Sequence, residues 1–69
     1  ELRALALKIA HRVLETGKSE VIRRRLNSYE RRVVHVAIAD VDGVRSESIK
    51  QDGEKRVEIS PATAGDGEE

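Results

Sequence analysis

The chain has 69 residues, contains no cysteine, and carries 13 basic and 13 acidic residues. Its length predicts one small domain, and the lack of cysteine excludes a disulfide framework and a thiolate metal site. No apolar run approaches the roughly 20 residues of a transmembrane helix and no signal-peptide pattern is visible, so we expect a cytoplasmic protein.

The zero net charge conceals an uneven distribution of charge along the chain. Residues 18–35 hold six basic side chains and two acidic ones, whereas residues 36–69 hold four basic and nine acidic ones. A basic segment in an otherwise acidic chain is typical of a surface that binds phosphates. The sequence therefore predicts a basic patch around the middle of the chain, with ordinary solvated arginines as the alternative.

The first predicted element is an amphipathic helix over residues 2–16. Its apolar side chains recur at spacings of three and four residues, which places them on one face. Gly17 follows and suits the left-handed conformation in which many helices end. The residues expected on the core face are Leu2, Leu5, Ala6, Ile9 and Val13.

Residues 20–25 predict a short strand at an edge of a sheet. Val21 and Ile22 favour a strand, but three consecutive arginines break the alternation of apolar and polar residues. Charged side chains on an edge strand discourage unwanted pairing. The same arginines would place positive charge beside the helix that follows.

A second helix is predicted to begin after Asn27 and to end near Asp40, with a turn at Asp42-Gly43. Asn27 is a good N-cap, and Glu30 three residues later completes a capping box. The ring of Tyr29 is expected to pack over the helix end. The apolar arc consists of Val33, Val34, Ala37, Ile38 and Val41, and the opposite, solvent-facing arc carries Ser28, Arg31, Arg32, His35 and Ala39.

Residues 44–50 and 55–60 predict two strands of a hairpin around Asp52-Gly53, a strong short-turn signal. That turn would set Val57 opposite Ser48 and Ile59 opposite Ser46, all on the core face. It would also set Glu47 opposite Glu58, an unfavourable pair that a bulge or a longer loop would relieve.

The fold class predicted from this order is α+β, with two helices on one face of a small three-stranded sheet. The element order is helix, strand, helix, strand, strand. Pro61 ends the last strand, so we expect residues 1–61 to form the domain. Residues 62–69 are small and acidic and predict a disordered tail.

The segment Asn27-Ser28-Tyr29-Glu30-Arg31-Arg32-Val33-Val34-His35 resembles the R3H domain family, named for an arginine and a histidine separated by three residues. Residues 7–17, the sequence Gly-Val-Arg-Ser-Glu-Ser at 43–48 and Lys-Arg-Val-Glu-Ile at 55–59 extend the resemblance to the R3H domain of bacterial Jag proteins. It covers about residues 2–61. The arginines at 23–25 depart from the Jag pattern, which usually has an apolar residue and prolines there.

The resemblance implies a domain that binds single-stranded nucleic acid, RNA in preference to single-stranded DNA. Jag proteins carry a KH domain before the R3H domain, so we expect a linked KH domain upstream of Glu1 and a monomeric isolated domain. No acid–base pair, metal-ligand cluster or phosphate-binding glycine loop is recognisable. The sequence therefore predicts no enzyme, no metal site and no cofactor.

The candidate contacts to nucleic acid centre on the pair that the family name describes. Arg31 can bind a phosphate through two N–H donors or stack on a base, and the helix N-terminus favours an anion there. His35 can donate to a phosphate or a base, or stack on a base. The predicted set is Arg31, His35, Arg32, Ser28, Arg23, Arg24 and Arg25, with Arg45 and Arg56 as secondary candidates on the far face of the sheet.

Composition limits the mode of binding that these residues predict. Tyr29 is the only aromatic residue of the chain, so a platform of several stacking rings is missing. Binding is therefore expected to be mainly to phosphate and steeply dependent on salt. A protein-interaction module, docking through the acidic hairpin and tail, remains the alternative.

Overall fold

The computed structural model of this chain describes residues 1–62. The elements in that range are α1 (Leu2–Thr16), β1 (Glu20–Val21), α2 (Ser28–Ala39), β2 (Val44–Gln51) and β3 (Glu54–Pro61). This order confirms the predicted α+β class. The predicted strand at residues 20–25 is shorter than expected, because only Glu20 and Val21 pair as strand residues and the arginines after them leave the sheet.

Both helices begin and end on local signals that the sequence carries. The carboxylate of Glu1 accepts a hydrogen bond from the N–H of Ala4, and Gly17 ends α1 with φ 72°. At α2, Asn27 Oδ1 accepts from the N–H of Glu30 at 2.8 Å, while Glu30 Oε1 accepts from the N–H of Asn27 at 2.9 Å. These reciprocal bonds are the predicted capping box, and they satisfy two donors that the first helical turn leaves without partners.

The three strands form one antiparallel sheet in the order β1-β3-β2, so the last strand of the described residues lies in the centre. Asp52 and Gly53 form the hairpin turn with φ values of 55° and 79°. Two positive φ values are the signature of the turn that matches the twist of paired strands. Val57 is opposite Ser48 and Ile59 is opposite Ser46, which confirms the predicted register.

The expected bulge in the hairpin is absent from the residues that the structure describes, because β2 and β3 pair continuously from Val44–Pro61 to Gln51–Glu54. Glu47 therefore stays opposite Glu58. In this register Arg45 and Arg56 take the diagonal positions on the same face of the sheet. Diagonal neighbours are within reach of long side chains in antiparallel sheets, so the register sets one arginine position diagonally from each of the two glutamates.

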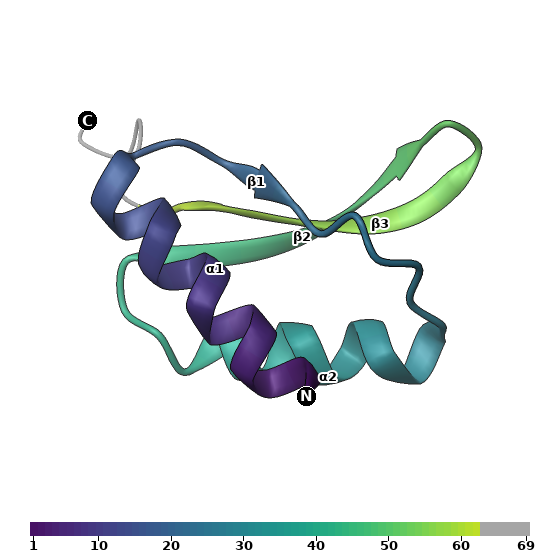
Figure 1. Cartoon of the computed structure of the whole chain (residues 1–69), viewed down its shortest axis with the longest axis horizontal. Helices are drawn as coiled ribbons and strands as arrows, with labels where there is room; N and C mark the ends of the chain where they lie inside the picture. The colour runs from purple at the N-terminus through teal and green to yellow at the C-terminus, as the bar shows by residue number, and fades with distance from the viewer. Residues whose placement is uncertain (63–69) are drawn as a thin grey trace.

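Both helices cover the same face of the sheet, and Figure 1 shows the hairpin extending beyond them above the N-terminal end of α2. The core lies between these layers. Its buried apolar residues are Ala6, Ile9, Ala10, Val13, Ile22, Leu26, Val34, Ala37, Ile38, Val44, Val57 and Ile59. Because the core ends before the hairpin does, the outer part of the helix-facing sheet surface is left for polar residues.

An ion pair joins α1 to the edge strand. The guanidinium of Arg12 donates to both oxygens of Glu20, from Nη2 at 2.6 Å and from Nε at 3.0 Å. These hydrogen bonds, together with the positive charge of Arg12, lower the pKa of Glu20. The pair fixes a strand that has only two residues in the sheet.

Two further observations concern the ends and the surface of the fold. The N–H of Ala62 donates to the carbonyl oxygen of Gly43 at 2.9 Å, which fastens the end of β3 to the turn before β2. The rest of the predicted tail, residues 63–69, lies outside the described residues. Among residues 1–62, neither helix has the length and apolarity that crossing a membrane requires.

Candidate nucleic-acid interface

Arg31 and His35 lie on the flank of α2 that faces β2, and both are half-buried. We predicted them on the solvent side, and that prediction is wrong. Residue spacing places the pair correctly on one face of the helix, but the hairpin extends along that face. The pair is therefore set in the seam between α2 and the outer part of β2.

The imidazole of His35 is held by two serines of β2. Its Nδ1 lies 2.6 Å from Ser46 Oγ and its Nε2 lies 3.2 Å from Ser48 Oγ. A serine hydroxyl both donates and accepts, so either ring tautomer is satisfied by this pair. Alternate residues of a strand share one face, which is why both hydroxyls reach the same ring. His35 thereby links α2 to β2.

Arg31 turns back over the beginning of its own helix. Its Nη1 donates to the carbonyl oxygen of Leu26 at 2.9 Å, and its Nη2 lies 3.5 Å from Ser28 Oγ, a long and weak contact. A guanidinium group has five N–H donors. The contact to Leu26 therefore orients the side chain and leaves N–H donors for a ligand.

Two lysines that the prediction omitted complete a basic depression around Arg31. A hollow of about 270 Å³ between the start of α2 and the hairpin is lined by Arg31, Ser48, Ile49, Lys50 and Lys55. Lys50 and Lys55 are opposite each other in the register, and both are exposed. The predicted hairpin register already set these lysines opposite each other on the face of Ser46 and Ser48, so it carried the signal that could have found them.

Arg32 and Ser28 are exposed on α2, as predicted. With 100° of rotation per residue, both positions lie on the crest of the helix, between the flank of Arg31 and the flank that faces α1. Arg32 does not line the basic depression, and it lines instead a groove on the flank of α2 that faces α1.

The arginines at 23–25 are exposed but do not form one cluster with the motif. Arg23 and Arg24 line a surface hollow beside α1, together with Leu5, Ile9 and Arg12. Arg25 is directed toward the hairpin, where its Nη2 lies 2.9 Å from Glu54 Oε2. Of the three arginine side chains, only that of Arg25 forms an ion pair with an element that also lines the basic depression.

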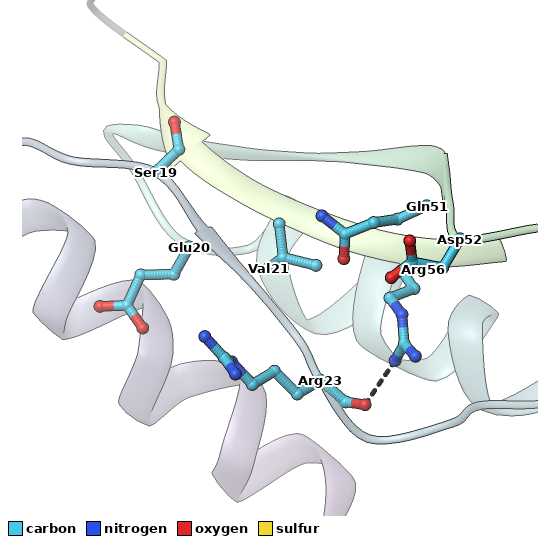
Figure 2. A pocket seen from close by; sticks show the side chains of 7 residues that line it. All are labelled: Ser19, Glu20, Val21, Arg23, Gln51, Asp52 and Arg56. Atoms are coloured by element: carbon cyan, nitrogen blue, oxygen red, sulfur yellow. Dashed lines mark hydrogen bonds between the residues drawn. The ribbon is translucent and has the colours of Figure 1, made fainter. Parts of the chain in front are cut away.

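The secondary candidates Arg45 and Arg56 lie on the sheet face opposite the helices, as predicted. Arg45 is exposed, whereas Arg56 is half-buried and donates to the carbonyl oxygen of Arg23 and to Glu54. Figure 2 shows the Arg56 guanidinium reaching that carbonyl at the rim of a polar hollow. Arg56 thus braces the arginine segment where it leaves the sheet.

Tyr29 is 74% exposed, so the expectation that its ring packs over the helix end is wrong. The ring instead borders a groove of about 430 Å³ on the side of α2 that faces α1. Val36, one of the few other large apolar residues exposed among residues 1–62, lies in the same groove at 60% exposure.

The structure thus defines a small α+β domain with a seam of basic and hydroxyl side chains between α2 and the hairpin. The model of the R3H domain family matches residues 1–61, so the chain belongs to the R3H domain family. R3H domains generally bind single-stranded RNA or DNA and are not typically enzymes. Among curated proteins, no significant match to this chain was found.

Proposed function

We propose that this domain binds single-stranded nucleic acid, RNA in preference to DNA, mainly through phosphate contacts in the depression between α2 and the hairpin. The observation that carries the proposal is the convergence of Arg31, Lys50 and Lys55 on one hollow at a helix N-terminus. Three cationic groups and the field of the helix favour an anion there. Arg32 and Ser28 extend this surface over the crest of α2.

The shape of the depression favours a strand over a compact anion. The hollow is shallow, and its three cationic groups come from three elements, α2, β2 and β3. Arg31 offers paired donors to a phosphate, whereas the lysines act as mobile point charges. Such an arrangement suits successive phosphates of one backbone, with little discrimination among sequences.

His35 acts in this proposal as a positioning residue. Both of its ring nitrogens already contact serines of β2, so a direct contact to the strand would require one of these bonds to break. The bonds instead hold the hairpin, and with it Lys50, at a fixed distance from Arg31. The Arg-x3-His spacing then combines one ligand contact with one structural contact a helical turn away.

We further infer that the domain is of the Jag type and works beside a KH domain. The hairpin sequence at 43–48 and the segment before His35 support this proposal. A single shallow basic site gives weak affinity, whereas two linked modules bind with a higher effective concentration. Measuring RNA affinity of the domain alone and of the natural full-length protein tests it, since equal affinities would contradict a linked RNA-binding module.

The site is tested by titrating labelled single-stranded RNA and DNA with Arg31→Gln and with Lys50→Ala/Lys55→Ala. Each variant removes at least one phosphate contact, and we expect affinity to fall about 3- to 10-fold, to a similar extent for unrelated sequences. Fluorescence anisotropy at low salt measures the affinity. Arg31→Lys keeps the positive charge but loses the planar set of guanidinium donors. Its affinity should lie between those of wild type and Arg31→Gln.

Lys8→Ala is the control for the loss of a positive charge. Lys8 is exposed on α1 and does not line the depression, so the substitution removes one charge elsewhere on the surface. Circular dichroism verifies that each variant is folded. Unchanged affinity in both test variants would refute the site. If the NMR signals of the wild-type protein do not shift on addition of either nucleic acid at low salt, the result supports the alternative that the domain is a protein-interaction module.

A further inference from the structure

The groove beside Tyr29 lies on the opposite flank of α2 from Arg31 and His35. Its floor consists of Val33, Val36 and Ala37 of α2, and Arg3 of α1 and Arg32 stand at its border. Tyr29 and Val36 keep most of their surface exposed. The groove is thus a solvent-exposed apolar surface that carries an aromatic ring, on a domain that is rich in charged residues.

The chemistry of the groove indicates the kind of group that fits it. Its lining combines a planar ring and apolar carbons with two guanidinium groups, Arg3 and Arg32. A nucleobase has flat faces that stack on tyrosine and on guanidinium planes, and it is attached to an anionic backbone that the same arginines attract. An aliphatic side chain of a protein partner would fill the floor but would leave the groove with an unmatched positive charge, because Asp40 supplies only one negative charge against two arginines.

Helical geometry connects this groove to the phosphate site. Positions 29, 33 and 36 lie on one flank of α2 and positions 31 and 35 on the other, with Ser28 and Arg32 on the crest between them. A strand whose phosphates bind at Arg31 and Arg32 crosses the helix at its first turns. The base next to that crossing then lies directly over the groove.

We propose that the groove formed by Tyr29, Val33, Val36, Arg3 and Arg32 is a base-stacking site for single-stranded nucleic acid. This inference rests on the proposed function, because the phosphate site brings the strand to the groove. Asp40 closes the other end of the groove with a negative charge. The base therefore enters from the side of Arg32, and the backbone stays away from Asp40.

The absence of other aromatic residues makes the test direct. Tyr29 is the only tyrosine, and the chain has no phenylalanine or tryptophan, so the only other aromatic side-chain signals of the protein come from its two histidines. We titrate the domain with a single-stranded RNA oligonucleotide and with an abasic oligonucleotide of equal length and charge. Ring-current shifts of the Tyr29 ring protons are expected with the first and not with the second.

Variants separate stacking from phosphate binding. Tyr29→Ala should weaken binding of the base-containing strand about 5- to 10-fold, which is about 1–1.4 kcal/mol and the lower end of what one stacked base contributes. Binding of the abasic strand should stay unchanged. Tyr29→Phe, which keeps the ring, should bind as wild type does. Arg31→Gln should weaken binding of both strands. Because Tyr29 is 74% exposed, its replacement should leave the fold intact.

The possible outcomes distinguish this inference from the proposed function. If both strands bind equally and the Tyr29 protons do not shift, the base site is refuted while phosphate binding stands. If neither strand binds, both proposals fail, and the groove is better assigned to a protein partner. If Tyr29→Ala weakens both strands equally, the ring supports the phosphate site and does not stack on a base.

Discussion

His35 illustrates how one side chain of a recognition motif can join two elements. Its ring is bonded to Ser46 at 2.6 Å in a half-buried position and to Ser48 at 3.2 Å in a more exposed one. Loss of a buried partner leaves a polar atom desolvated, whereas loss of an exposed partner is compensated by water. The two serines should therefore differ in their contribution to stability.

We predict that Ser46→Ala lowers the free energy of unfolding by about 1 kcal/mol, the usual range for a buried hydrogen bond. Ser48→Ala should lower it by less. Urea denaturation followed by circular dichroism measures both values. Equal effects of the two substitutions would show that the seam is open to water on both sides of the ring.

Glu20 provides a residue-scale prediction about pH. Hydrogen bonds from Arg12 hold the pKa of Glu20 below its ordinary value in the folded chain, so the unfolded chain binds more protons as pH falls through the range between the two pKa values. The stability from this pair is fully present above about pH 4.3, the ordinary pKa of glutamate, and is lost below it. Glu20→Gln should therefore be less stable than wild type at pH 7 and lose less on acidification.

Thermal melts of wild type and Glu20→Gln from pH 7 to pH 3 check this prediction. Glu15→Gln is the matched control, because Glu15 is exposed on α1 and has no ion pair within residues 1–62. A pH dependence that is the same in all three proteins would contradict the role assigned to Glu20.

At the scale of elements, α2 depends on its capping box. Asn27→Ala removes the acceptor for the N–H of Glu30, and we expect it to lower the free energy of unfolding by about 1 kcal/mol. Asn27→Ser keeps a capping oxygen and should cost much less. Chemical denaturation of the two variants measures the difference, and equal stability would mean that packing alone determines where α2 begins.

The elements were predictable from sequence because their signals are local. The cap at Asn27, the turn at Asp52-Gly53 and the hairpin register all follow from short patterns, and the structure confirms each one. The environment of Arg31 and His35 was not predictable in this way. Helical periodicity identifies the buried stripe but does not reveal which neighbouring element lies along its flank.

The prediction omitted Lys50 and Lys55 for the same reason, because local patterns do not give the positions of neighbouring elements. The predicted register set Lys50 opposite Lys55, but only the placement of the hairpin over the start of α2 brings both beside Arg31. Conversely, Arg23 and Arg24 looked like part of the motif because they are near it in sequence. The edge strand directs them toward α1 instead.

For the whole molecule, a net charge of zero coexists with a depression lined by three cationic side chains. With about 3–5 phosphates neutralised, the logarithm of the association constant should fall against the logarithm of salt concentration with a slope of about −2 to −3.5. Anisotropy titrations between 25 and 200 mM salt, as an order-of-magnitude range that brackets physiological conditions, measure the slope. An affinity independent of salt would refute the phosphate-based account.

The order of the strands in the sheet has a consequence for how the chain acquires its structure during synthesis. β3 is the last element and lies between β1 and β2, so neither edge strand has a partner until β3 has left the ribosome. The helices can form earlier, but the sheet, the serine contacts to His35 and the basic depression form late and together. A ribosome stalled within β3 would therefore display a chain that has its motif helix and still lacks the basic depression.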